Sequence, residues 1–228
     1  MTGTRVSRTA RTLMAVGIVA VLAVSAGVFL VLRREPSSQD RVHSVIRSLE
    51  RYWDRADSDL GFVYRHVSAD RITIGDEGVR CDGKVISKKD VSNNAMVLQD
   101  CREGIAVAYD PKYATVSQAR IEGVFSHEWG HVIQAEASQL DISLDDQGLP
   151  IDAELQADCF SGAWARHAAE SSLKALQADA AESGDDRGTA VDDPQAHGLA
   201  GERVVAFDVG WKRGPRGCVD QLLDALPG

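Results

Sequence analysis

The chain has 228 residues, of which 44% are hydrophobic and 26% are charged. It is therefore too long for a disulfide-stabilised mini-protein and too apolar for a disordered tail, and one ordinary domain is expected. Five arginines and no acidic residue precede Glu35, so the rest of the chain carries 34 acidic against 20 basic residues. Because this excess of carboxylates repels phosphate, and no stripe of lysine and arginine offsets it, the composition argues against a nucleic-acid-binding protein.

The first element in chain order is an apolar segment. Residues 13–32 carry no charge, follow a short basic tail at residues 1–12, and would form a helix about 30 Å long, enough to span a bilayer. We expect a single uncleaved membrane anchor, because the apolar run continues to Leu32 before two arginines follow. A cleaved signal peptide ending near the small residues Val24-Ser25-Ala26 is the alternative interpretation.

The globular part is expected to cover residues 41–228, after a segment of linker composition at residues 33–40. Its first element is predicted to be an amphipathic helix, because apolar residues recur there at helical spacing: Val42, Ile46, Leu49 and Trp53. Two short strands follow, at residues 71–74 and 104–109.

The second half of the chain has helical patterning throughout. Three helices are predicted, the second of which can contain a break: residues 117–138, 152–181 and 199–211. The expected fold class is therefore α+β, mostly helical with a small sheet.

The motif that carries chemistry is His127-Glu128-Trp129-Gly130-His131. Residues four apart on a helix project from the same face, so both imidazoles can reach one metal ion. Glu128 would lie beside that ion, where it can accept a proton from an attacking water molecule. Two ligands do not complete a site, and a third histidine is absent from the position expected for the three-histidine class, where Ala137 stands.

A carboxylate can supply the third ligand, and Glu154-Leu-Gln-Ala-Asp158 contains two. The 22 residues between His131 and Glu154 allow one helix to end, the chain to turn, and a second helix to return alongside the first. Glu154 would then face the two histidines, and Asp158, one turn further on, could accept the second ring N–H of either His127 or His131. The alternative is that both acids are solvated surface carboxylates.

Four cysteines are present, an even number that can form two disulfides if the domain lies outside the cytoplasm: Cys81, Cys101, Cys159 and Cys218. Three pairings are formally possible. Four buried thiols in a reducing compartment are the alternative.

The chain resembles the neutral zinc metallopeptidases, which combine a His-Glu-aromatic-Gly-His motif with a downstream Glu-Leu-Gln-Ala-Asp-Cys-Phe motif. Both motifs occur here, at residues 127–131 and 154–160, and Asp193-Pro-Gln-Ala-His197-Gly198 adds to the resemblance. A second zinc family of membrane-bound peptidases shares the ligand pattern, but its members have several spanning helices.

The resemblance implies a zincin-like domain that binds one Zn²⁺ ion outside the cytoplasm, behind a single membrane anchor. It also implies disulfides that join Cys81 to Cys101 and Cys159 to Cys218. His197, at a matching family position, is the first candidate for stabilising the transition state, and an ordinary loop histidine is the alternative. Other candidates for that role are Tyr109, Tyr113 and Arg203.

The predicted function is that of a membrane-anchored zinc endopeptidase. His127, His131 and Glu154 would hold the metal, Glu128 would act as the general base, and a peptide or protein would be the substrate. The edge of the strand at residues 104–109 could bind an extended peptide by strand addition. The alternative function is a non-catalytic domain, stabilised by zinc, that binds a partner outside the cytoplasm.

Overall fold

The computed structural model describes residues 38–74, 78–87, 89–91, 94–99, 101–140, 142, 150–185 and 196–220. The expected basic tail, the anchor at residues 13–32 and the first part of the linker lie outside the described residues. Among the helices of the described part, none is long and apolar enough to cross a membrane.

The first described helix, α2, spans Ser38–Trp53. The predicted apolar stripe is confirmed, because none of its four residues is more than 6% exposed. The helix begins at Ser38, inside the stretch that was expected to be linker. Asp40 lies in the first helical turn, where a negative charge favours helix formation through the helix dipole.

The main sheet has three strands in the order β1-β5-β4: Ile72–Ile74, Ala106–Tyr109 and Ala95–Leu98. The central strand β5 is parallel to β1 and antiparallel to β4. The expectation that residues 104–109 offer a free edge to a peptide is therefore wrong, because both edges of β5 are hydrogen-bonded within the sheet. A separate antiparallel hairpin joins β2 to β3: Val79–Cys81 and Lys84–Ile86.

Helices form most of the rest: α3, α4, α5, α6, α7 and α8 span Asp57–Leu60, Gln118–Gln139, Pro150–Ala168, Leu173–Glu182, Ala200–Arg213 and Pro215–Asp220. Two short 3₁₀ helices, η1 and η2, span Ala69–Arg71 and Pro111–Ala114. The break expected within residues 152–181 falls between α5 and α6. Ser172 makes the restart favourable, because its side chain accepts a hydrogen bond from the backbone N–H of Ala175.

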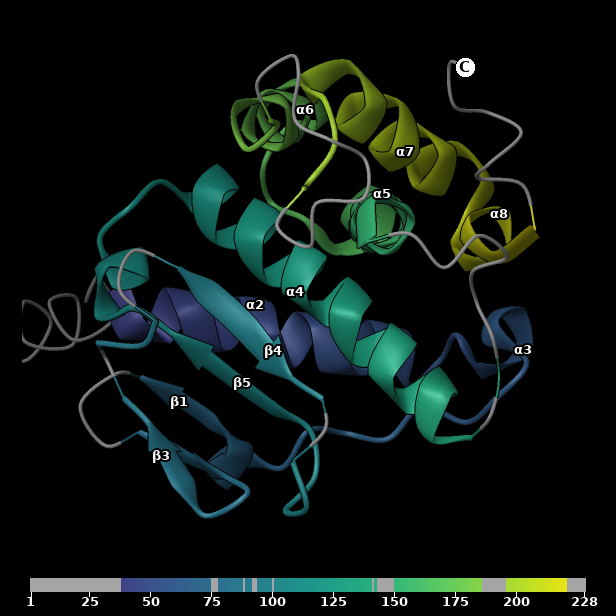
Figure 1. Cartoon of the computed structure of the whole chain (residues 1–228). Coiled ribbons are helices and arrows are strands. Elements are labelled where there is room, and N and C mark those ends of the chain that lie inside the picture. Colours follow the sequence, from purple (N-terminus) through teal and green to yellow (C-terminus); the bar gives the residue numbers. More distant parts are fainter. Residues whose placement is uncertain are drawn as a thin grey trace, which may run out of the picture. The chain divides into compact units, whose positions relative to one another are not determined.

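Helix α4 runs through the middle of the domain, with the sheet and α2 on one side and α5, α6 and α7 on the other (Figure 1). Large aromatic side chains fill the space around it, among them Trp53, Phe125, Trp129 and Phe160, none of which is exposed. On the far side, α5 and α7 approach closely at Gly210, where a Cβ atom would lie only 1.8 Å from the carbonyl oxygen of Cys159. The mostly helical α+β class predicted from the sequence is confirmed.

The four cysteines form two disulfides, Cys81–Cys101 and Cys159–Cys218, with Cα–Cα distances of 4.7 and 5.6 Å. The first joins the end of β2 to the segment that precedes β5. The second joins the middle of α5 to α8, and therefore fixes the chain's last described helix to the helix that carries Glu154. Both pairings agree with those that the family resemblance implied.

We predict that the two disulfides contribute unequally to stability. Closing a loop of 59 residues restricts the unfolded chain more than closing one of 20, so loop entropy assigns about 4 kcal/mol to Cys159–Cys218 and about 3 kcal/mol to Cys81–Cys101. Urea unfolding of the two double-serine variants measures this difference. A larger loss of stability for the Cys81 and Cys101 pair would contradict the prediction.

Candidate metal centre

Helix α4 presents the two histidines because its opposite face is held in the core. The helix begins after Ser117, whose side chain accepts a hydrogen bond from the backbone N–H of Arg120. Trp129 is fully buried on the core face, and its indole N–H donates to the hydroxyl of Tyr64 at 3.0 Å. This contact fixes the rotation of α4 about its axis.

Helix α5 brings the carboxylate, and Gly130 lets it come close enough. A Cβ atom at Gly130 would lie 2.5 Å from the Cα atom of Ala157, closer than real Cβ contacts occur. The glycine between the two histidines of the motif therefore has a structural cause: it is the point at which α5 packs on α4. Ala157 follows Glu154 by one helical turn, so the same contact sets the position of Glu154.

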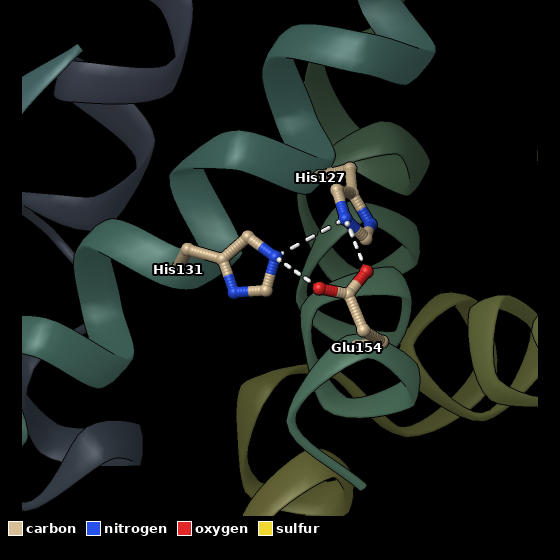
Figure 2. A group of neighbouring side chains, drawn as sticks. All are labelled: His127, His131 and Glu154. Carbon is tan, nitrogen blue, oxygen red and sulfur yellow. Dashed lines mark hydrogen bonds and ion pairs between the residues drawn. The ribbon is translucent and has the colours of Figure 1, made fainter. Parts of the chain in front are cut away.

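The three predicted metal ligands converge on one point (Figure 2). His127 Nε2 lies 3.1 Å from Glu154 Oε2, and His131 Nε2 lies 3.2 Å from Glu154 Oε1. The two Nε2 atoms are 3.2 Å apart. Ligands bound at about 2.0–2.1 Å around a tetrahedral metal ion are separated by about 3.3 Å, so each of these spacings is close to that between two ligands of one ion, with each histidine facing a different oxygen of Glu154.

Asp158 fixes the proton of the first histidine. Its Oδ1 atom lies 2.8 Å from His127 Nδ1, and a carboxylate oxygen can only accept, so Nδ1 carries the hydrogen and Nε2 presents a lone pair. The predicted hydrogen bond between Asp158 and one of the two motif histidines is present, and the partner is His127. Arg203 holds Asp158 in turn, because its Nε and Nη2 atoms donate to the two carboxylate oxygens at 2.6 and 2.8 Å.

A residue that sequence analysis missed, Gln134, fixes the proton of the second histidine. Its amide nitrogen donates to the carbonyl oxygen of Ala153 at 2.7 Å and to Gln156 Oε1 at 3.0 Å. Its amide oxygen must therefore face His131, and it accepts from Nδ1 at 2.8 Å. The amide of Gln156 is oriented independently, because it donates to the carbonyl oxygen of Cys218.

The consequence is that, when both imidazoles are neutral, three electron-pair donors face one another with no hydrogen between them. Both imidazole Nε2 atoms are unprotonated when Nδ1 carries the hydrogen, and Glu154 Oε2 is buried without accepting any hydrogen bond. Such an arrangement is repulsive for the side chains alone and favourable around a cation. Two imidazoles and one carboxylate therefore fit a divalent metal ion, and these three residues could hold one.

The acid–base properties of the centre follow from its charges. Burial lowers the pKa of His127, but the carboxylates of Asp158 and Glu154 outweigh burial and raise it to about 10. Burial raises the pKa of Glu154, yet the two histidines, when they carry a proton on Nε2 in place of a metal ion, bring it well below its ordinary value. A group of this kind binds cations strongly, whether protons or a metal ion, because the lone pairs and the negative charge are directed at the same point.

The three ligands line a cavity of about 520 Å³ bounded by β4, α4, α5, α6 and α7. Glu128 and His197 line it as well. Glu128 is 9% exposed, and burial raises the pKa of its carboxyl group. The predicted metal ligands and the predicted general base therefore line the same cavity.

The structure separates the four candidates for stabilising a transition state. Tyr109 lies in the core, where its ring packs 4.8 Å from that of Phe125, and it does not face the cavity. Arg203 lines the cavity, but its guanidinium is hydrogen-bonded to the carboxylate of Asp158. Tyr113 and His197 both line the cavity, and the side chain of His197 is 48% exposed.

Comparison with family models, curated proteins and solved structures found no match to this chain. The resemblance to the zinc metallopeptidases therefore stays a prediction, and the interpretation of the site depends on its own geometry.

We predict that Gln134 sets the metal affinity of the centre. Gln134→Met keeps the volume of the side chain but removes the acceptor for His131, and loss of such a supporting hydrogen bond lowers metal affinity by about 10- to 100-fold. Competition with a chromophoric chelator measures the affinity. Gln139→Met, at the exposed end of the same helix, is the matched control. Equal affinities for the two variants would contradict the assignment.

Proposed function

We propose that the chain is a zinc-dependent peptidase. The observation that carries this proposal is the convergence of His127, His131 and Glu154 on one point that opens into a cavity, with Glu128 in the same wall. A purely structural zinc site closes all four positions with protein ligands, whereas three protein ligands leave one position for a reactant. No fourth histidine, cysteine or carboxylate joins the three among the described residues.

Zinc is the ion that this donor set suits best. Imidazole and carboxylate ligands in tetrahedral spacing are typical of zinc, whereas calcium and magnesium prefer all-oxygen sites of higher coordination number. When bound, zinc would acidify a water molecule and polarise the carbonyl group of a peptide bond. His127, His131 and Glu154 would hold it, with Asp158 and Gln134 keeping the two imidazoles in the correct tautomer.

In this mechanism Glu128 moves the proton. Its carboxylate accepts a proton from the water whose oxygen bonds to the peptide carbon, and then donates that proton to the amide nitrogen as the C–N bond breaks. Burial supports the role, because it raises the pKa of Glu128 and so makes its carboxylate a stronger proton acceptor than an exposed one.

A hydrogen-bond donor would also be needed for the negative charge that develops on the carbonyl oxygen. His197 is our first choice because its half-exposed imidazole lines the cavity, and the Tyr113 hydroxyl is the second. Arg203 is a poorer choice, since it is buried and bonded to Asp158.

Strand β4 offers the best place for the substrate backbone. It forms one edge of the three-stranded sheet, and its residues from Ala95 to Val97 line the cavity opposite the metal ligands. An extended peptide could pair with this edge and present its bonds to the centre. The zincin-like assignment rests on this combination of an edge strand with the metal-binding helix.

We also propose that the domain works outside the cytoplasm, on a membrane anchor formed by residues 13–32. The supporting observations are the uncharged sequence of that segment and the two disulfides, which form and persist in oxidising compartments.

The decisive experiment compares the wild-type protein with Glu128→Gln. Removing the proton acceptor should leave the zinc content unchanged and lower the cleavage of unfolded casein by at least about 100-fold. Zinc content is measured by atomic absorption, and cleavage by the release of fluorescent peptides. Glu170→Gln, an exposed carboxylate between α5 and α6, is the control and should keep full activity.

Equal zinc content and equal proteolysis in the wild type and in Glu128→Gln would contradict the peptidase. That result would favour the second function expected from the sequence, a zinc-stabilised domain that binds a partner without catalysis.

A further inference from the structure

A second polar group lies in the same cavity, two helical turns before the metal ligands on α4. Arg120 precedes His127 by seven residues and therefore projects from nearly the same face of the helix. Its Nη1 atom donates to Asp179 Oδ1 at 3.1 Å and to the Ser183 hydroxyl at 2.7 Å. It is also hydrogen-bonded to the side chain of Tyr113. The guanidinium is thus held in a fixed position in the cavity wall.

Both members of the ion pair between Arg120 and Asp179 line the cavity, and Arg120 is the more accessible of the two. The side chain of Arg120 is 33% exposed, whereas that of Asp179 is 10% exposed. The bonds to Asp179 and Ser183 both use Nη1, so even with the contact to Tyr113 the five N–H groups of the guanidinium leave donors for a ligand. A neutral pair arranged in this way attracts an anion, because the ligand meets the cation first.

The other charged groups of the cavity do not compete with Arg120. Arg203 is 5% exposed and bound to Asp158, which is itself 3% exposed. Glu154 would be a zinc ligand, and Glu128 is 9% exposed. Among the described lining residues, Arg120 is therefore the arginine or lysine that a substrate can approach.

We propose that Arg120 determines substrate specificity by binding a substrate carboxylate. Seven residues of helix place it about 10 Å from His127 along the axis, which equals about three residues of an extended peptide. The enzyme would then prefer peptides with a carboxylate about three residues from the cleaved bond, either on an aspartate or glutamate side chain or at the chain terminus. This inference rests on the proposed peptidase activity.

The test uses one peptide that the zinc-loaded enzyme cleaves, identified by mass spectrometry of a casein digest. Versions with glutamate or glutamine at each of four positions on either side of the bond compete in one reaction, as do versions ending in a free carboxylate or an amide. The measured quantity is the ratio of kcat/KM values within one protein, so a general loss of activity cancels. We expect about a tenfold preference for the carboxylate at one position.

The preference should fall to less than about twofold in Arg120→Gln and persist in part in Arg120→Lys, which keeps the charge but loses the forked geometry. Arg47→Gln, an exposed arginine on α2, should keep the full preference. A preference for glutamate over glutamine would show that Arg120 binds an acidic side chain within the substrate. A preference for the free carboxylate over the amide would show that it binds the C-terminus of the substrate. No preference at any position, or one unchanged in Arg120→Gln, would overturn the proposal.

If the wild type cleaves no peptide, the peptidase proposal fails, and a binding measurement decides the carboxylate subsite separately. Polyalanine peptides that end in a free carboxylate or an amide, or carry one glutamate or glutamine, are then titrated into zinc-loaded Glu128→Gln protein, with and without Arg120→Gln. Tighter binding of the acid that disappears with Arg120→Gln supports the subsite. Equal binding of acid and amide overturns it.

Discussion

The centre depends on one electrostatic constraint: the two imidazole Nε2 atoms lie 3.2 Å apart, each lies 3.1–3.2 Å from one oxygen of Glu154, and the Nδ1 protons point away from the group. Such an arrangement costs free energy, and the fold maintains it through hydrogen bonds on the outer side of each imidazole. Asp158, held by Arg203, orients His127, and Gln134, held by two acceptors, orients His131. The free energy released when a cation binds offsets this repulsion. The packing of α4 against α5 therefore favours cation binding, because it holds the three side chains in place.

Helix α5 is fixed from several sides, which explains how a single carboxylate can be placed so closely. Gly130 allows α4 to touch it, Gly210 allows α7 to touch it, and the Cys159–Cys218 disulfide joins it to α8. Gln156 then links these contacts to the centre, because it donates to the carbonyl of Cys218 and accepts from Gln134. A shift of α8 would thus change the position of His131, because the side-chain amides of Gln156 and Gln134 connect the two.

The three candidate metal ligands were predictable from sequence because their geometry is local. Histidines four residues apart share a helix face in any context, and Glu154 and Asp158 share one for the same reason. Which histidine Asp158 supports depends on how two helices cross, and spacing does not determine that. Gln134 was missed because its role depends on contacts with α5, which the spacing of residues along α4 does not reveal. Strand β4 was not predicted because four residues are too few to show the alternation of apolar and polar residues that marks a strand. The edge of the sheet that β4 forms was therefore not predicted either.

One histidine is hydrogen-bonded to a carboxylate and the other to a neutral amide, and this difference affects the net charge of the site. Asp158 is cancelled by Arg203, and the amide of Gln134 adds no charge, so a divalent ion bound to Glu154 would leave one positive charge. Glu128 lies in the same wall and supplies one negative charge when ionised. A second carboxylate in place of Gln134 would make the buried site net negative, and would oppose the ionisation of Glu128 on which proton transfer depends. The neutral amide therefore orients His131 at no cost to the proposed general base.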